Sequence, residues 1–304
     1  MDIGLVFVGV TVFTLMLTIG VNQSFDQLTS LWRQPGILIR SLLAVIVLVP
    51  VVALILLWVF DLPPEVATGL AVLAAAPGAP LTTKRSQMAA ADVDYITSLQ
   101  LTLALSAVFV TPCILAIFYA IFELQTERVN PLQLVWQIAS VTFLPVVIGL
   151  LLQRIAPQFV KMIRQPINVI ANVLFLLLVV ALVVAMAVLP EARAKLLVGW
   201  PAITAIVLMA VAALTIGHLL GGPRLDYRGG LAVACIARNL GLAAYIVGLG
   251  ESSEEMIPTL LAYAVVGAAL AIPYSIWIKR ILKAEGDSEK NKSEIPVGKN
   301  EQKG

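Results

Sequence analysis

The stretch from Gly69 to Gln87 reads GLAVLAAAPGAPLTTKRSQ, and it decides the fold. Its first half is apolar enough to enter a membrane, but Pro77, Gly78 and Pro80 interrupt it. Prolines remove backbone donors and break the hydrogen-bond ladder of a helix. In lipid, such an interruption persists only where protein or a water-filled cavity satisfies the freed backbone groups. The stretch therefore predicts a broken membrane helix beside a cavity.

A second copy of this pattern begins at Gly230 and reads GLAVACIARNLGL. The pairs Leu81–Leu242 and Pro112–Pro273 keep the spacing of 161 residues that separates the two starting glycines. Broken helices at matching positions of two halves are typical of the binding sites of secondary transporters.

Composition predicts an all-α polytopic membrane protein. The chain has 304 residues, of which 60% are hydrophobic and 12% are charged, and no soluble domain of this length needs so much apolar surface. We expect nine transmembrane passes, two of them broken (64–92 and 226–251). The other passes are expected at 3–22, 37–60, 95–122, 132–153, 167–189, 197–220 and 255–278.

The expected transporter domain covers residues 1–282, with a first repeat at 1–122 and a second at 131–282. The remaining segment, 283–304, is charged and without periodicity, which predicts a disordered cytoplasmic tail. Five crossings separate the two copies, so they face opposite ways and form an inverted-topology repeat.

Charge in the loops predicts the orientation. Most arginines and lysines fall on one side of the nine-pass arrangement, and the loops of the other side are mainly acidic. By the positive-inside rule, the amino terminus is outside and the carboxyl terminus is cytoplasmic, in a plasma (inner) membrane. Because the basic residues sit in membrane loops, the net charge of +2 indicates no nucleic-acid partner.

Three motifs resemble the bile acid:sodium symporter family. PGAPLTT at 77–83 resembles that family's PGG-T-x-S-N stretch, RNLGLA at 238–243 resembles its QNSGLA stretch, and LWRQPG at 31–36 resembles its amino-terminal pattern. The resemblance covers nearly the whole chain up to about Leu282. It implies a panel domain plus a core domain in which two discontinuous helices cross, and alternating-access transport of a small organic anion, usually driven by sodium.

The chain departs from the family at the residues that bind sodium. Thr82 and Thr83 stand where the family has a serine–asparagine pair, Ala234 replaces an acidic residue, and Arg238 replaces a glutamine. Only Asn239 is kept, so a sodium site would consist of Thr82, Thr83 and Asn239. Since no carboxylate remains and a cation is added, we expect weak or no sodium coupling. The alternative to a symporter is a sodium-independent exchanger or uniporter, or a membrane solute sensor.

Arg238 is the candidate that most needs an explanation, because an unpaired arginine at membrane depth costs several kcal/mol. Its partner is either the carbonyl end of the half-helix 226–237, in which case the guanidinium stands in for a bound cation, or an anionic substrate. A structural role facing cytoplasmic water, Asp92 or Asp94 is the remaining alternative.

The predicted substrate-binding residues surround the two breaks, where free amides at helix starts attract anions. They are Arg238, Asn239, Thr82, Thr83, Lys84, Gly78 and Gly241. Thr82 and Thr83 have helix capping as the structural alternative.

Further polar residues lie on the expected passes. Ser98 and Thr102 lie on one face of the helix after the first break and, with Gln100, are candidates for a cation site or a polar stripe. Asn168 and Asn172 lie one turn apart on the sixth pass, where they contact solute in a panel–core cleft or form hydrogen bonds between helices.

The sequence gives little support to two other functional classes, intramembrane enzymes and channels. An intramembrane enzyme would need paired aspartates at depth, a zinc-binding cluster or a serine near a histidine, and the chain's single histidine, His218, is far from any candidate nucleophile. A channel would require like residues in a symmetric ring. We therefore expect no enzyme activity, no cofactor other than sodium as a doubtful coupling ion, and a small organic anion and the lipid bilayer as partners.

Overall fold

The computed structural model describes residues 3–80, 82–122, 131–188, 199–250 and 253–293, and within these ranges every regular element is a helix. The helices are α1 (Ile3–Asn22), α2 (Phe25–Trp32), α3 (Pro35–Leu42), η1 (Leu43–Leu48), α4 (Val49–Val59), α5 (Pro64–Ala75), α6 (Thr82–Met88), α7 (Val93–Phe122), α8 (Pro131–Ile138), η2 (Ala139–Phe143), α9 (Leu144–Ile155), α10 (Pro157–Val188), α12 (Gly199–Leu220), α13 (Leu225–Ile236), α14 (Leu240–Val247) and α15 (Ser253–Ser293).

Eight helical segments in the described ranges are long and apolar enough to cross a membrane. One of them joins α3, η1 and α4 through a π-helical turn, and another covers α13 and α14 together. The apolar helix α5 is shorter than these. The chain is therefore an all-helical integral membrane protein.

The described chain leaves the helical conformation between α5 and α6 and between α13 and α14. After α5 ends at Ala75, the chain stays non-helical to Pro80, and α6 begins at Thr82. Pro77 and Pro80 have no N–H to continue the ladder, and Gly78 has a φ of +76°, which disfavours other residues. The second interruption is shorter and separates α13 from α14 by residues 237–239.

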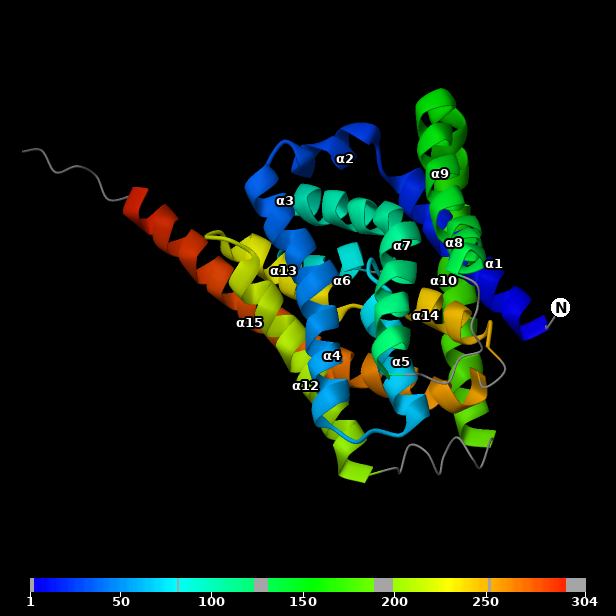
Figure 1. Ribbon diagram of the computed structural model, residues 1–304. Helices are drawn as coiled ribbons and strands as arrows, with labels where there is room; N and C mark the ends of the chain where they lie inside the picture. The colour runs from blue at the N-terminus through cyan, green and yellow to red at the C-terminus, as the bar shows by residue number, and fades with distance from the viewer. Residues whose placement is uncertain (1–2, 81, 123–130, 189–198, 251–252, 294–304) are drawn as a thin grey trace, which may run out of the picture.

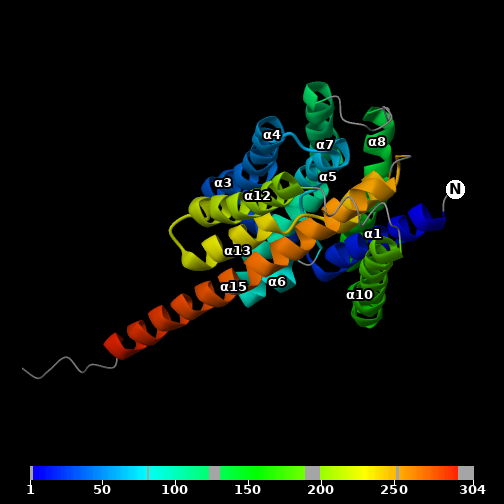
Figure 2. The same ribbon diagram turned by 90° about the horizontal axis from the view of Figure 1, so that it is seen from below.

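The helices fall into two groups in space (Figures 1 and 2). On one side, α1 packs along α9 and α10. On the other, α12 packs along α13, α4 and α15, with α5, α6 and α7 towards the middle of the molecule. Glycines allow the closest approach within the first group, since a Cβ added to Gly20 would lie 2.2 Å from the Val146 carbonyl oxygen, and one added to Gly149 would lie 2.6 Å from the backbone nitrogen of Val21.

Burial separates the interrupted helices from the outer ones. All side chains from 66 to 75 in α5 and from 229 to 236 in α13 are buried. By contrast, α10 exposes apolar side chains such as Val169, Val173 and Leu176, as expected of a helix that faces lipid. The interrupted helices therefore form the protected centre of the molecule.

The carboxyl-terminal segment differs from its prediction. We expected disorder from residue 283, but α15 continues as a helix to Ser293. Residues 284–293 are rich in Glu, Lys and Asp, which are compatible with an exposed helix even though they lack an apolar face. The rest of the expected tail, 294–304, lies outside the described residues.

Candidate functional site

The two interruptions meet through Asn239. Its backbone N–H donates to the Ala76 carbonyl at 3.0 Å, and its side-chain Nδ2 donates to the Gly78 carbonyl at 3.5 Å. The same side chain caps α14, because Asn239 Oδ1 accepts from the Leu242 N–H at 3.1 Å. Asn239 is 1% exposed. It therefore joins the two breaks and also satisfies one of the free amides at the start of α14.

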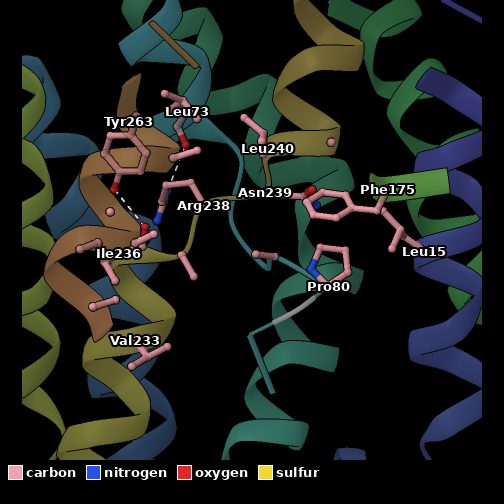
Figure 3. A pocket seen from close by; sticks show the side chains of 17 residues that line it. Leu15, Leu73, Pro80, Phe175, Val233, Ile236, Arg238, Asn239, Leu240 and Tyr263 are labelled. Carbon is pink, nitrogen blue, oxygen red and sulfur yellow. Dashed lines mark hydrogen bonds between the residues drawn. The ribbon is translucent and has the colours of Figure 1, made fainter. Parts of the chain in front are cut away.

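Arg238 lies beside Asn239 and holds the carbonyl end of α5 (Figure 3). Its Nε donates to the Leu73 carbonyl at 3.0 Å, its Nη2 to the Ala74 carbonyl, and its Nη1 to the Val45 carbonyl at 3.3 Å in η1. The side chain is buried, with 5% of the residue exposed. The last carbonyls of a helix lack partners and carry partial negative charge, so the guanidinium balances the end of α5.

This arrangement corrects one detail of the sequence interpretation. The half-helix whose carbonyl end compensates Arg238 is α5, in the other half of the chain, rather than α13, which directly precedes the arginine. Asp92, the alternative partner considered for Arg238, has other partners. Its Oδ2 accepts from Arg224 Nη2 at 3.1 Å, and its Oδ1 accepts from the Tyr95 N–H at 2.8 Å. Each of the three guanidinium nitrogens of Arg238 already donates to a carbonyl, which argues against direct binding of an anion.

Arg224 marks the start of α13 and is tied down by acidic neighbours. Its guanidinium hydrogen-bonds Asp226 and Asp92 and lies 4.1 Å from the centre of the Tyr227 ring. The hydrogen bond to Asp226 raises the pKa of Arg224 above its ordinary value. Tyr227 in turn stacks on Tyr95, with ring centres 4.4 Å apart. This cluster links the first turns of α7 and α13.

A small cavity of about 60 Å³ lies at the meeting point (Figure 3). Arg238, Asn239 and Gly241 line it together with mainly apolar side chains, and a Cβ on Gly241 would lie 3.2 Å from Val12 Cγ2. Tyr263 also lines it and donates from its hydroxyl to the Ile236 carbonyl at 3.2 Å. The cavity is far smaller than the pockets that usually hold organic ligands, which measure roughly 300–1,000 Å³.

A larger cavity of about 410 Å³ adjoins the small one, and Leu15 and Pro80 line both. It lies between α1, α2 and α10 on one side and α6, α7 and the first interruption on the other. Nine of its fourteen lining residues are polar: Thr18, Asn22, Gln23, Gln27, Gln87, Thr97, Gln100, Asn168 and Asn172. Its volume is within the range of cavities that hold small organic molecules.

The structure brings several predicted residues to these cavities. Gln100 lines the larger one, and its Nε2 donates to the Ala79 carbonyl at 3.1 Å and the Pro80 carbonyl at 2.7 Å, so it satisfies backbone groups that the interruption leaves without helical partners. Asn168 and Asn172 also line it. Asn168 also exchanges two side-chain hydrogen bonds with Asn22 of α1, at 2.8 and 3.1 Å, which is the helix–helix alternative, while its contact with a solute stays a prediction.

Ser98 and Thr102, predicted for a cation site or a polar stripe, both accept hydrogen bonds from α2. Ser98 Oγ accepts from the Leu31 N–H at 3.3 Å, and Thr102 Oγ1 accepts from Trp32 Nε1 at 3.0 Å. Both donors come from the last turn of α2, a short helix that begins with a capping box of Ser24 and Gln27. The stripe therefore anchors α2 on α7.

The predicted residues of α6 are only partly described. Thr82 is buried, and within the described residues its hydroxyl has no hydrogen-bond partner. Thr83, Lys84 and Arg85 belong to the helix, but their side chains lie outside the described part. Sequence reasoning missed six polar lining residues: Thr18, Asn22, Gln23, Gln27, Gln87 and Thr97. They are scattered over α1, α2, α6, α7 and the connection between α1 and α2, and share no periodic signal.

Comparison with known proteins identifies one family. A family model described as Sodium Bile acid symporter family matches residues 9–189, which is more than half of the chain. The comparison with curated proteins gave no significant match.

Proposed function

Because the chain belongs to the sodium bile acid symporter family, a family of membrane transporters, we propose that it is a secondary transporter that moves a small organic solute by alternating access. The observation that carries this proposal is the polar cavity of about 410 Å³, which opens beside the place where the two interrupted helices meet. Interrupted helices place backbone dipoles at a solute site.

We assign the moving parts from the packing of the helices. The panel consists of α1, α8–η2–α9 and α10, and the core contains both interrupted pairs, α5–α6 and α13–α14, together with the helices around them. In this proposal each interrupted pair is one of nine passes, and the two pairs are oppositely directed copies of an inverted repeat. The larger cavity has walls from both groups, so sliding of the core against the panel would open it to either side in turn. The arginine-rich loops face the cytoplasm.

Arg238 replaces a coupling cation in this proposal. A cation bound at the end of α5 would need oxygen ligands such as the Leu73 and Ala74 carbonyls, and the guanidinium already occupies those oxygens. The described residues that line either cavity include no aspartate or glutamate. Transport is therefore independent of sodium, and the protein works as a uniporter or exchanger.

The experiment is uptake of a mixture of small organic solutes into proteoliposomes, with mass spectrometry of the trapped contents. The mixture contains neutral and anionic metabolites, and protein-free liposomes measure leakage. We expect at least one solute to equilibrate much faster with protein present, and to exchange when the same solute is placed on both sides. No protein-dependent entry of any component would contradict the proposed function.

A further inference from the structure

The larger cavity is lined by carboxamides. Seven of its fourteen lining residues are asparagine or glutamine, two are threonine, and the other five are apolar. They come from four separated parts of the chain: α1 with the start of α2, α6, α7 and α10. No lysine, arginine, histidine, aspartate or glutamate is among the described lining residues.

Two arginines that the structure describes close to these walls, Arg238 and Arg164, are engaged elsewhere. Arg238 lines the smaller cavity and gives its guanidinium to three backbone carbonyls. Arg164 precedes Asn168 by one turn of α10, but it does not line the cavity. Its Nη2 donates to the Val21 carbonyl at 3.4 Å and to Gln153 Oε1 at 3.5 Å.

The chemistry of a carboxamide sets the class of ligand. A carboxamide has one oxygen that accepts and one NH₂ group that donates. In this cavity Gln100 gives its NH₂ to the Ala79 and Pro80 carbonyls, and Asn22 and Asn168 bond each other. A hydroxyl or amide of a solute can pair with either end, whereas a carboxylate only accepts and meets the carboxamide oxygens with repulsion. Removing a charge from water without a compensating charge costs far more than removing a hydrogen-bonded hydroxyl.

We infer that the solute is net-neutral at pH 7 and carries several hydroxyl or amide groups, in the manner of a polyol, a sugar or a nucleoside. This inference rests on the proposed transport function and replaces the organic anion that the family resemblance implies. The cavity volume of about 410 Å³ accommodates molecules of this size.

The test uses solutes matched in size and different in charge. The proteoliposomes receive one mixture of six solutes. It contains glucitol with its charged counterparts gluconate and glucosamine, uridine with its charged counterpart uridine monophosphate, and taurocholate. We expect protein-dependent entry of glucitol or uridine to exceed that of its charged counterpart by roughly tenfold or more. Preferred entry of gluconate, glucosamine, uridine monophosphate or taurocholate would overturn the inference and leave the transport function standing. Entry of none of them would overturn both.

A pair of matched variants ties the selectivity to the cavity. Gln87→Leu removes a carboxamide from the wall, and Gln133→Leu makes the same change at an exposed position of α8 that does not line it. We expect Gln87→Leu to reduce entry of the preferred neutral solute roughly three- to tenfold, by loss of one or two hydrogen bonds. Gln133→Leu leaves it unchanged. Equal uptake by Gln87→Leu and the unaltered protein would place the solute elsewhere.

Discussion

Replacing Arg238 by glutamine tests whether its guanidinium holds the crossing together. The substitution keeps a polar side chain but removes the charge and leaves at most one NH₂ group for the carbonyls of Leu73, Ala74 and Val45. Each buried acceptor that loses its partner costs about 1–3 kcal/mol. Part of this destabilisation is offset, because the variant no longer pays the desolvation cost of a buried charge.

We expect a net loss of about 2–4 kcal/mol in the free energy of unfolding, from two or three carbonyls that lose a donor less the desolvation cost of the removed charge. For a chain of this length, the loss corresponds to a fall of roughly 5–10 °C in the melting temperature. The assay is thermal unfolding of purified protein in detergent. Arg40→Gln is the matched control, since Arg40 is exposed in α3 and its change is expected to be within about 0.5 kcal/mol.

The same assay tests whether the Arg238 guanidinium stands in the place of a bound cation or has a structural role alone. In equal concentrations of sodium or choline chloride, the unaltered protein is expected to melt at the same temperature. Arg238→Gln leaves carbonyl oxygens that a sodium ion can approach, so sodium is expected to stabilise the variant by mass action. If Arg238→Gln were as stable as the unaltered protein in both salts, the assignment of the guanidinium to the end of α5 would be refuted.

Three further substitutions test other parts of the structure by melting temperature. Gly149→Ala forces a methyl group into the backbone of α1 and is expected to cost about 1–3 kcal/mol or more. Its control Gly36→Ala, with no atom within 4 Å of the new Cβ, is not expected to have this cost. Equal losses in the two variants would contradict the close packing of α1 and α9. Gly78→Ala strains a backbone with φ of +76° and is expected to cost about 1–2 kcal/mol; an unchanged stability would mean that the first interruption is conformationally free. Ser98→Ala removes the hydrogen bond that the Leu31 N–H of α2 donates to α7 and is expected to cost about 0.5–1.5 kcal/mol, more than Ser106→Ala, whose hydroxyl donates within its own helix; the reverse order would refute the anchoring of α2.

Helix content and the non-helical backbone around Pro77 and Pro80 could be predicted because they follow from local chemistry. Proline and glycine at 77–80 act on the backbone of their own segment, whatever the fold around them. The length of apolar runs likewise predicts membrane crossings without knowledge of packing. The helical end of α15 was missed because charge and missing periodicity indicate an absence of core contacts, which a terminal helix does not require.

The partners of the site residues were harder to predict because they come from distant parts of the chain. Arg238 was identified from its cost in lipid, but its carbonyl partners at 73 and 74 lie 165 and 164 residues earlier. Ser98 was predicted to belong to a cation site or a polar stripe, because a row of hydroxyls has the same pattern whether it faces an ion or a neighbouring helix. Gln87 has no periodic context at all, and only the fold brings it to the carboxamide wall.

The most direct test of the account is the initial rate at which the preferred solute enters proteoliposomes with and without an inward sodium gradient, at equal ionic strength with choline as the replacement. With Arg238 in the place of a coupling cation, we expect equal rates in the two conditions and no uphill accumulation driven by sodium. A several-fold stimulation by the gradient, with accumulation above the external concentration, would contradict it.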